Sequence, residues 1–314
     1  MLRRFFRFLR RLVILLVLLA AIGFAGFWYL TEPETVSPLV LRQHTADLAN
    51  GKAVFHAGGC ASCHATPKQA DKTRLGGGLG LASPFGTFYV PNISPHPSDG
   101  IGGWSEAQFV TALIKGTSPG GEHYYPAFPY TSYQRARFGD LRDLLAYIKT
   151  LPPVPGRVRG HDLPPPFNIR RGLGLWKFLY LDSASFVPET GKSAAWNRGA
   201  YLVQAFGHCA ECHSPRDALG GIVEKQRFAG GPSPDGKGWV PNITQKALGK
   251  WSEKDIAYVL ETGDLPDGDS VGAEMVDVVR NTAQLPAADR TAIASYIKSL
   301  APVTGPLPPS KPKQ

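Results

Sequence analysis

The sequence predicts a mainly α-helical protein with an N-terminal transmembrane helix and two tandem helical domains. Three observations carry this prediction: an uncharged apolar run from Leu12 to Leu30, two Cys-x-x-Cys-His strings, and an internal repeat 147 to 150 residues apart. The chain has 314 residues, a length that suits about two domains. Its 35 glycines and 28 prolines are many for helical domains and predict long loops between short helices, with no large sheet.

The first segment, residues 1–30, is expected to be an Arg-rich cytoplasmic end and a transmembrane anchor. The apolar run holds nineteen residues, which nearly cross a bilayer core of about 30 Å. Because arginines stay on the cytoplasmic side, we expect a single pass of the bacterial inner membrane with the rest of the chain in the periplasm. Trp28 and Tyr29 would then lie at the far interface. A cleaved signal peptide is the alternative, although no clear cleavage site precedes Thr31.

The positive charge is concentrated at that end of the chain. Of a net charge of +9, five units come from the first eleven residues, which leaves +4 over residues 12–314. The sequence therefore predicts no nucleic-acid partner.

All four cysteines belong to two strings of one form, C-A-S-C-H at 60–64 and C-A-E-C-H at 209–213. In such a string the two thiols form thioethers to haem vinyl groups, and the histidine binds the iron. We therefore predict two covalently attached haem c groups, held by Cys60, Cys63, His64, Cys209, Cys212 and His213. A four-thiolate zinc site and redox disulfides are the alternatives, but zinc sites space their cysteine pairs by about 15 to 20 residues. Here 145 residues separate the two pairs.

The repeat divides the chain into domains. Val-Pro-Asn-Ile at 90–93 recurs at 240–243, Trp-Ser-Glu at 104–106 recurs at 251–253, and Tyr-Ile-Lys at 147–149 recurs at 296–298. Each haem string heads one copy of the repeated unit. The predicted units are a first domain at 42–154, a linker at 155–195, a second domain at 196–303 and a disordered tail at 304–314.

Each copy should contain three main helices. The first helices are expected at 47–58 and 196–207, directly before the haem strings. The middle helices should begin at the capping pairs Ser105/Gln108 and Ser252/Asp255 and stop at Gly116 and Gly263. The terminal helices, with apolar residues at helical spacing over 141–148 and 293–300, should pack on the first helices. The linker centre, 167–181, is too apolar for a mere spacer, so it should pack across both domains, onto a partner or at the membrane interface.

A haem iron that only carries electrons needs a second axial ligand, for which Met and His are the usual choices. Besides Met1 the chain has one methionine, Met275, and we predict that it binds the second iron. In the first copy the corresponding zone holds Phe128, which cannot bind iron. His123 is the best substitute there, His56 and His96 are weaker ones, and an unidentified ligand or an open iron remains an alternative.

Several further motifs resemble the multihaem cytochrome c subunits of membrane-bound bacterial alcohol, aldehyde and gluconate dehydrogenases. The matching residues are Leu75-Gly76-Gly77-Gly78, Pro84-Phe85-Gly86-Thr87, Pro91-Asn92-Ile93, Trp104-Ser105, 125–133 and 197–201. The resemblance covers residues 44–303 and implies two class I cytochrome c-like domains. It also implies electron transfer from a periplasmic dehydrogenase subunit, a quinoprotein, flavoprotein or molybdoprotein, to quinone or to a downstream cytochrome or oxidase. Those subunits typically carry three haems and many have Met where Phe128 stands, so this chain departs from them in both respects.

The sequence thus favours an electron-transfer subunit over an enzyme. The alternative is a dihaem oxidase or peroxidase in which the first iron is open to substrate. A structural or ligand-sensing module is a third hypothesis, but it would need no second haem.

Overall fold

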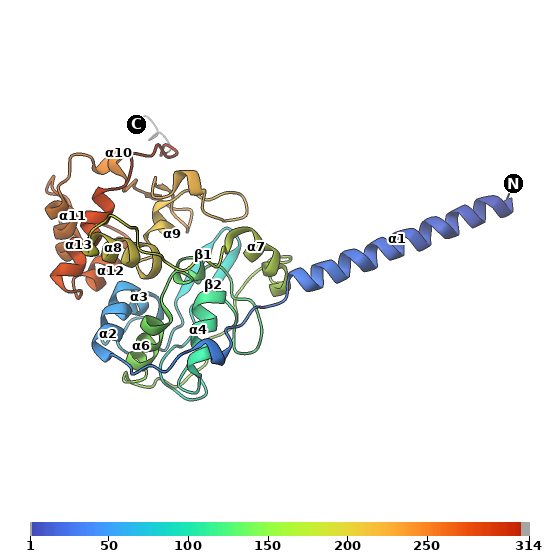
Figure 1. Ribbon diagram of the computed structural model, residues 1–314, viewed down its shortest axis with the longest axis horizontal. Coiled ribbons are helices and arrows are strands. Elements are labelled where there is room, and N and C mark those ends of the chain that lie inside the picture. The colour runs from blue at the N-terminus through green and yellow to red at the C-terminus, as the bar shows by residue number, and fades with distance from the viewer. Residues whose placement is uncertain (1, 309–314) are drawn as a thin grey trace.

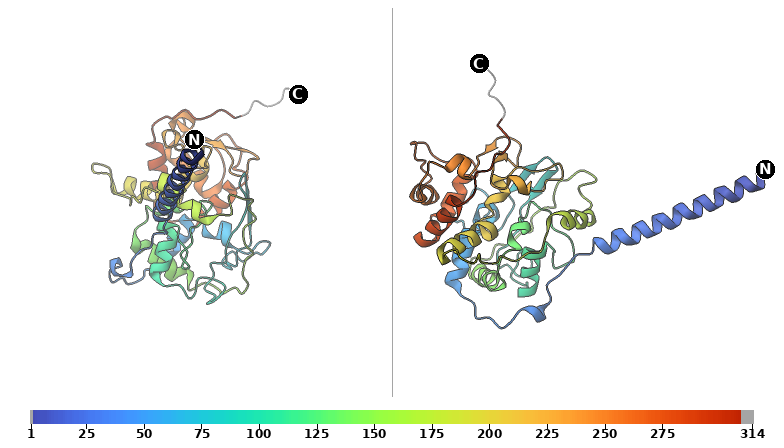
Figure 2. Two further views of the ribbon diagram at one scale, coloured as in Figure 1. Left: turned by 90° about the vertical axis from the view of Figure 1, so that its right-hand side faces the viewer. Right: turned by 45° about the horizontal axis from the view of Figure 1, so that its top comes forward.

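A computed structural model describes residues 2–308 of the chain (Figure 1). One long helix, α1 (Leu2–Leu30), projects from a globular part made of two mostly helical halves. The right view in Figure 2 also shows α1 leaving this part at one side, and in the left view α1 points toward the viewer. None of the residues of α1 is buried, and the helix is long and apolar enough to cross a membrane. Thr31, directly after it, is completely buried.

The first domain is built from short helices, as the sequence predicts, and it also contains one hairpin that was not predicted. The turn η1 (Pro38–Val40) precedes this domain, whose elements are α2 (Leu48–Ala57), α3 (Cys60–His64), β1 (Gly80–Ser83), β2 (Gly86–Tyr89), α4 (Glu106–Lys115), α5 (Tyr130–Tyr133) and α6 (Phe138–Ile148). Asp47 caps α2 by accepting from two backbone N–H groups. The predicted capping box at Ser105 and Gln108 is confirmed, and Gly116 ends α4 in the left-handed conformation. Helix α6 packs against α2, as expected.

The second domain repeats this plan. Its elements are α8 (Ala194–Tyr201), η3 (Leu202–Phe206), α9 (Cys209–His213), η4 (Glu224–Gln226), β3 (Gly231–Pro232), β4 (Trp239–Val240), α10 (Gln245–Leu248), α11 (Glu253–Thr262), α12 (Met275–Thr282) and α13 (Ala287–Lys298). The Ser252/Asp255 box and the Gly263 stop are confirmed, and α13 packs on α8. Two details differ from the prediction. The helix before the second string begins at Ala194 and ends in a wider π-helical turn, η3, and Met275 begins a helix of its own.

Each domain holds one two-stranded antiparallel sheet within the described residues. In the first, Gly80 pairs with Tyr89 and Ser83 with Gly86. In the second, Gly231 pairs with Val240. These hairpins lead into the two copies of the Val-Pro-Asn-Ile motif, so they set the position of the loops that follow.

The linker contains η2 (Arg170–Gly172) and helix α7 (Leu173–Tyr180). Trp176 packs edge-on against Tyr130 of the first domain, with ring centroids 6.1 Å apart. Its indole N–H donates to the Leu219 carbonyl of the second domain at 2.9 Å. Packing of the linker across both domains is therefore confirmed.

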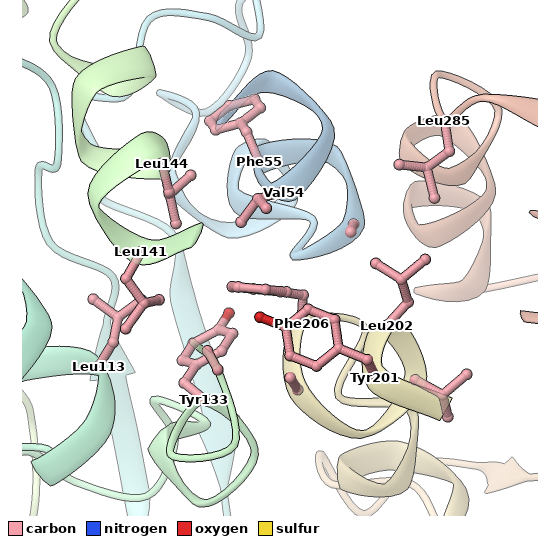
Figure 3. Packing of buried hydrophobic residues seen from close by; sticks show 14 of the residues in the cluster. Val54, Phe55, Leu113, Tyr133, Leu141, Leu144, Tyr201, Leu202, Phe206 and Leu285 are labelled. Atoms are coloured by element: carbon pink, nitrogen blue, oxygen red, sulfur yellow. The ribbon is translucent and has the colours of Figure 1, made fainter. Parts of the chain in front are cut away.

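The two domains share one hydrophobic core (Figure 3). Phe206, which is 1% exposed, lies at the centre of this shared core, with its ring centroid 6.4 Å from that of Tyr133. Tyr201 is equally buried, and its hydroxyl accepts from the Arg137 backbone N–H at 3.0 Å. Burial of apolar surface at this boundary fixes the domains relative to each other.

The predicted tail lies only partly within the described residues. The Thr304 carbonyl accepts from the Gln226 side chain at 3.2 Å. Residues 309–314 lie outside the residues that the structure describes.

Candidate functional site

The two haem strings form the short helices α3 and α9, each preceded by a residue in the left-handed conformation. In the first domain this residue is Gly59, with φ of 57°. In the second it is His208, with φ of 36°, a conformation that few side chains adopt. The His208 Nε2 donates to the Gly58 carbonyl of the other domain at 3.3 Å, so the strained residue also joins the two domains.

The string histidines are held in the form that binds iron. His64 Nδ1 lies 2.8 Å from the Pro91 carbonyl oxygen, and His213 Nδ1 lies 2.8 Å from that of Pro241. Because a carbonyl oxygen can only accept, each Nδ1 carries the proton and each Nε2 keeps its lone pair. Burial lowers the pKa of His64 to about 4 and also lowers the pKa of His213. Both rings are therefore neutral at pH 7 and fit a haem iron.

The repeated Val-Pro-Asn-Ile motif explains how these carbonyls are positioned. The Asn92 side chain donates to the Val154 carbonyl at 2.7 Å, beyond the terminal helix of the first domain. Asn242 donates to the Val303 carbonyl at 2.8 Å in the same way. The motif reveals the repeat in the sequence, but its role in positioning these carbonyls was not predicted. Its recurrence at a fixed distance from each haem string was the signal that could have revealed it.

The four thiols match attachment better than redox exchange. Burial raises the pKa of Cys60 and of Cys209 to about 12, whereas reactive Cys-x-x-Cys pairs have lowered thiol pKa values. None of the four cysteines forms a disulfide. Across residues 2–308, no group of three or more His, Cys, Asp and Glu side chains is placed to hold a metal ion.

Met275 begins a helix that packs on α11 of its own domain and on α2 and α3 of the first domain. It is the first residue of α12 and packs, partly buried, against the shared core. The pKa of Cys212 is raised first by burial and then by nearby negative charges, including Glu274, the residue before Met275. Iron ligation by Met275 stays a prediction.

His123 lies on the side of the first domain that meets the end of α1. It is 3% exposed, and its Nε2 donates to the Thr31 carbonyl at 2.9 Å. The Nδ1 atom is buried and has no hydrogen-bond partner among the described residues. Burial lowers the pKa of His123, and the nearby Lys177 and Arg171 lower it further. Ligation by His123 stays a prediction, and Nδ1 is the nitrogen with a free lone pair.

The weaker histidine candidates are otherwise placed. His56 is on α2, and its ring lies beside Asn281 of the second domain. His96 Nδ1 accepts from the Asp99 backbone N–H at 3.1 Å. Phe128 joins an aromatic cluster, with its ring centroid 5.5 Å from that of Tyr133. Burial raises the pKa of Tyr133, and Cys60 and Cys63 lie near enough to raise it further, so the aromatic cluster reaches the first haem string.

The two haem strings face each other across the domain boundary through equivalent contacts. Ser62 and Glu211 are 149 residues apart and hold the same place in their strings, as Ser132 and Asn281 do in their domains. Asn281 donates to the Ser62 hydroxyl at 2.8 Å. The Ser132 hydroxyl donates to Glu211 at 2.9 Å. The boundary is therefore an internal pseudo-two-fold contact in which each string binds the other domain.

Glu211 is the only charged residue inside either string. Its side chain is 11% exposed and pairs with Arg216 at 2.6 Å, while Thr131 also donates to it at 2.8 Å. Burial alone would raise its pKa, but Arg216 and the two hydroxyls outweigh burial and lower it. The carboxylate is therefore ionised at neutral pH and places a fixed negative charge between the two haem sites.

Comparison with known proteins agrees with this geometry. Residues 48–152 and 197–301 each match the family described as Cytochrome c. The chain is 50% identical over 286 residues to a diheme cytochrome c-type protein of Cereibacter sphaeroides, which covers 90% of this chain and 95% of that protein. It is 36% identical over 276 residues to the fructose dehydrogenase cytochrome subunit of Gluconobacter japonicus, covering 86% of this chain and 55% of the subunit. It is 32% identical over 297 residues to the gluconate 2-dehydrogenase cytochrome c subunit of Pantoea cypripedii, covering 90% of this chain and 64% of the subunit. The chain thus spans less than two thirds of both dehydrogenase subunits.

Proposed function

Since this chain belongs to the cytochrome c family, with two haem c groups, we propose that it is the membrane-anchored electron-transfer subunit of a dehydrogenase. It would pass electrons from a periplasmic quinoprotein, flavoprotein or molybdoprotein subunit to quinone or another respiratory carrier. Two observations support this: the cytochrome subunits of fructose and gluconate dehydrogenases are relatives, and the two haem strings face each other across one boundary. The facing strings are the main support for the proposal, because two haems attached close together can pass an electron from one to the other.

The residues of the two haem sites have separate roles in this electron transfer. The bound haems supply one-electron transfer, and the protein sets their ligation, burial and spacing. Cys60, Cys63, Cys209 and Cys212 hold the groups covalently, while His64 and His213 bind iron through Nε2. The Pro91 and Pro241 carbonyls keep these rings in the binding tautomer. Glu211 supplies a fixed negative charge between the two sites.

Anchoring is part of the proposal. Helix α1 would cross the inner membrane once, with its arginines in the cytoplasm and the haem domains in the periplasm. The exposed apolar surface of α1 from Leu12 to Leu30 supports it, since an apolar helix segment of that length without a burial partner suits lipid.

The function is tested by purifying the tagged full-length protein from native membranes and adding candidate substrates. We expect a dehydrogenase to co-purify and its substrate to reduce both haems. A variant with C209A and C212A is the control. It should carry only the first haem, so it shows whether the substrate reduces that haem by itself. If no substrate reduces the haems and no dehydrogenase co-purifies, the chain is not a dehydrogenase subunit.

We expect His123→Ala to turn the first haem into a high-spin form that binds CO, because the substitution removes the proposed sixth ligand. Optical and electron paramagnetic resonance spectra measure this change. H96A is the matched control, since His96 bonds only within its own loop in the described structure. An unchanged low-spin spectrum in H123A would refute ligation. CO binding by the unaltered first haem would instead support the oxidase or peroxidase alternative, with which Phe128 at the corresponding position is compatible.

We expect Glu211→Ala to lower the free energy of unfolding by about 2 kcal/mol, the size expected for lost hydrogen bonds to a charged group. It removes the partner of Arg216, Thr131 and Ser132 at the domain boundary. Both haem potentials should rise because a nearby negative charge opposes reduction. Denaturant titration and redox titration measure the two effects.

The control for this variant is Glu224→Ala. Glu224 also pairs with an arginine, Arg227, but its side chain is 65% exposed, so its loss should change stability by less than about 1 kcal/mol. If the two substitutions change the free energy of unfolding and the haem potentials equally, the boundary contacts of Glu211 contribute no more than an exposed ion pair.

A further inference from the structure

Helix α7 in the linker presents an unpartnered apolar face. Leu175, Phe178 and Leu179 are all exposed, Phe178 by 72% and Leu179 by 60%. Their spacing of three and four residues puts them on one side of the helix. Phe167 and Ile169, just before the helix, are exposed as well. This is a large amount of apolar surface for a linker that already packs across two domains.

The opposite face of α7 is fixed to the first domain. The buried Lys177 ammonium donates to the Lys115 carbonyl at 2.6 Å and to the Gly116 carbonyl at 2.7 Å, at the end of α4. It also lies 5.1 Å from the centre of the Tyr130 ring. Lysine side chains can hydrogen-bond the last carbonyls of a helix in this way. The rotation of α7 is thereby set, and its apolar side points outward.

The turn η2 directly before α7 and the first turn of α7 itself are joined to the end of α1. Arg171 Nε donates to the Thr31 hydroxyl at 2.8 Å, and its guanidinium lies 4.2 Å from the centre of the Trp28 ring. A Cβ at Gly174 would lie 2.5 Å from the Thr31 Cα. Helix α7 therefore contacts the residue that follows α1 at this point, and only glycine fits there. Figure 1 shows α7 beside the end of α1 that meets the globular part. Trp28 is a residue of the kind that sits at a membrane interface.

We propose that α7 lies on the periplasmic surface of the bilayer, with Leu175, Phe178 and Leu179 inserted at the boundary of headgroups and acyl chains. The inference rests on the proposed membrane anchoring by α1. The binding partner of this apolar face is the phospholipid surface. The contacts of Arg171 and Gly174 hold the face at the level of Trp28, where α1 leaves the membrane. An apolar helix face at this depth is stabilised by burial in the interface. Docking of α7 would hold both haem domains in one orientation to the membrane.

The test uses the full-length, haem-loaded protein in phospholipid nanodiscs without any partner. A nitroxide on F178C reports collisions with oxygen, which concentrates in lipid, and with a water-soluble nickel chelate. The native cysteines do not compete because haem attachment consumes them. A label on L16C reports whether α1 is in the membrane. A label on Y258C is the matched aqueous control, since Tyr258 is 53% exposed on α11, which lies at the far end from α1 (Figure 1).

We expect lipid-like accessibility at positions 16 and 178 and aqueous accessibility at 258. Lipid-like behaviour at 16 with aqueous behaviour at 178 would overturn this inference and leave the anchor intact. Aqueous behaviour at 16 would overturn both. Shielding of position 178 only after a dehydrogenase is added would show a protein-docking face and refute the lipid contact. Because these side chains are exposed, the labelled variants should keep the haem spectrum of the unaltered protein.

Discussion

A variant with alanine at both Cys60 and Cys63 is expected to carry one haem per chain instead of two. Thioether attachment needs the two thiols of one string, and each string serves one domain. The pyridine haemochrome assay and the mass of the intact protein measure haem content, which should fall by half. The remaining spectrum would belong to the second haem alone.

The matched control is the same change at Cys209 and Cys212, which should leave the first haem alone. Because the two domains share one core, loss of either haem should also lower the stability of the whole globular part. Should either double variant fail to accumulate, His64→Ala gives a second measurement: the haem stays covalently bound but loses its proximal ligand. Two covalent haems in the C60A/C63A protein would contradict the assignment of one haem to each string.

The second large effect is expected for Met275→Leu, which should make the second haem high-spin and able to bind CO. Loss of a thioether ligand should also lower the reduction potential of that haem, since Met ligation raises it. Leucine keeps nearly the same volume, so the cost in stability should be below about 1.5 kcal/mol. Optical spectra, CO titration and redox titration measure these changes, with one CO expected per chain.

Val276→Ala on the same helix is the control. Val276 is 40% exposed, so its truncation should leave the spectrum unchanged. A low-spin second haem in M275L would show that another group binds the iron. High-spin spectra in both variants would show that the effect comes from disturbing α12, and ligation by Met275 would then lose its support.

Much of the fold could be predicted from the sequence because its signals are local. The helix caps at Ser105 and Ser252, the stops at Gly116 and Gly263 and the haem strings each depend on residues within a few positions. Because the unit is repeated, each of these signals occurs twice in the chain. The less accurate predictions lie where local pattern is weak, as at the π-helical turn before Cys209 and the separate helix that begins at Met275.

The candidate site was predictable only in part. Residue types and spacing identify the attachment cysteines and the proximal histidines, because thioether and iron chemistry need those groups. They do not identify which backbone carbonyl holds each histidine, since any residue has a carbonyl. They also gave no reason to connect His123 with Thr31, which is 92 positions away.

The amino-acid order alone determined two domains, two haem strings and one apolar N-terminal helix, because these follow from composition, spacing and short-range hydrogen bonding. Only the tertiary structure decided how these parts meet. The bond between Ser62 and Asn281 joins residues 219 positions apart, and the contact of Arg171 with Thr31 spans 140. Contacts at such separations exist only after the shared core has formed and brought the chain segments together. The facing haem strings and the position of α7 beside α1 are therefore products of packing.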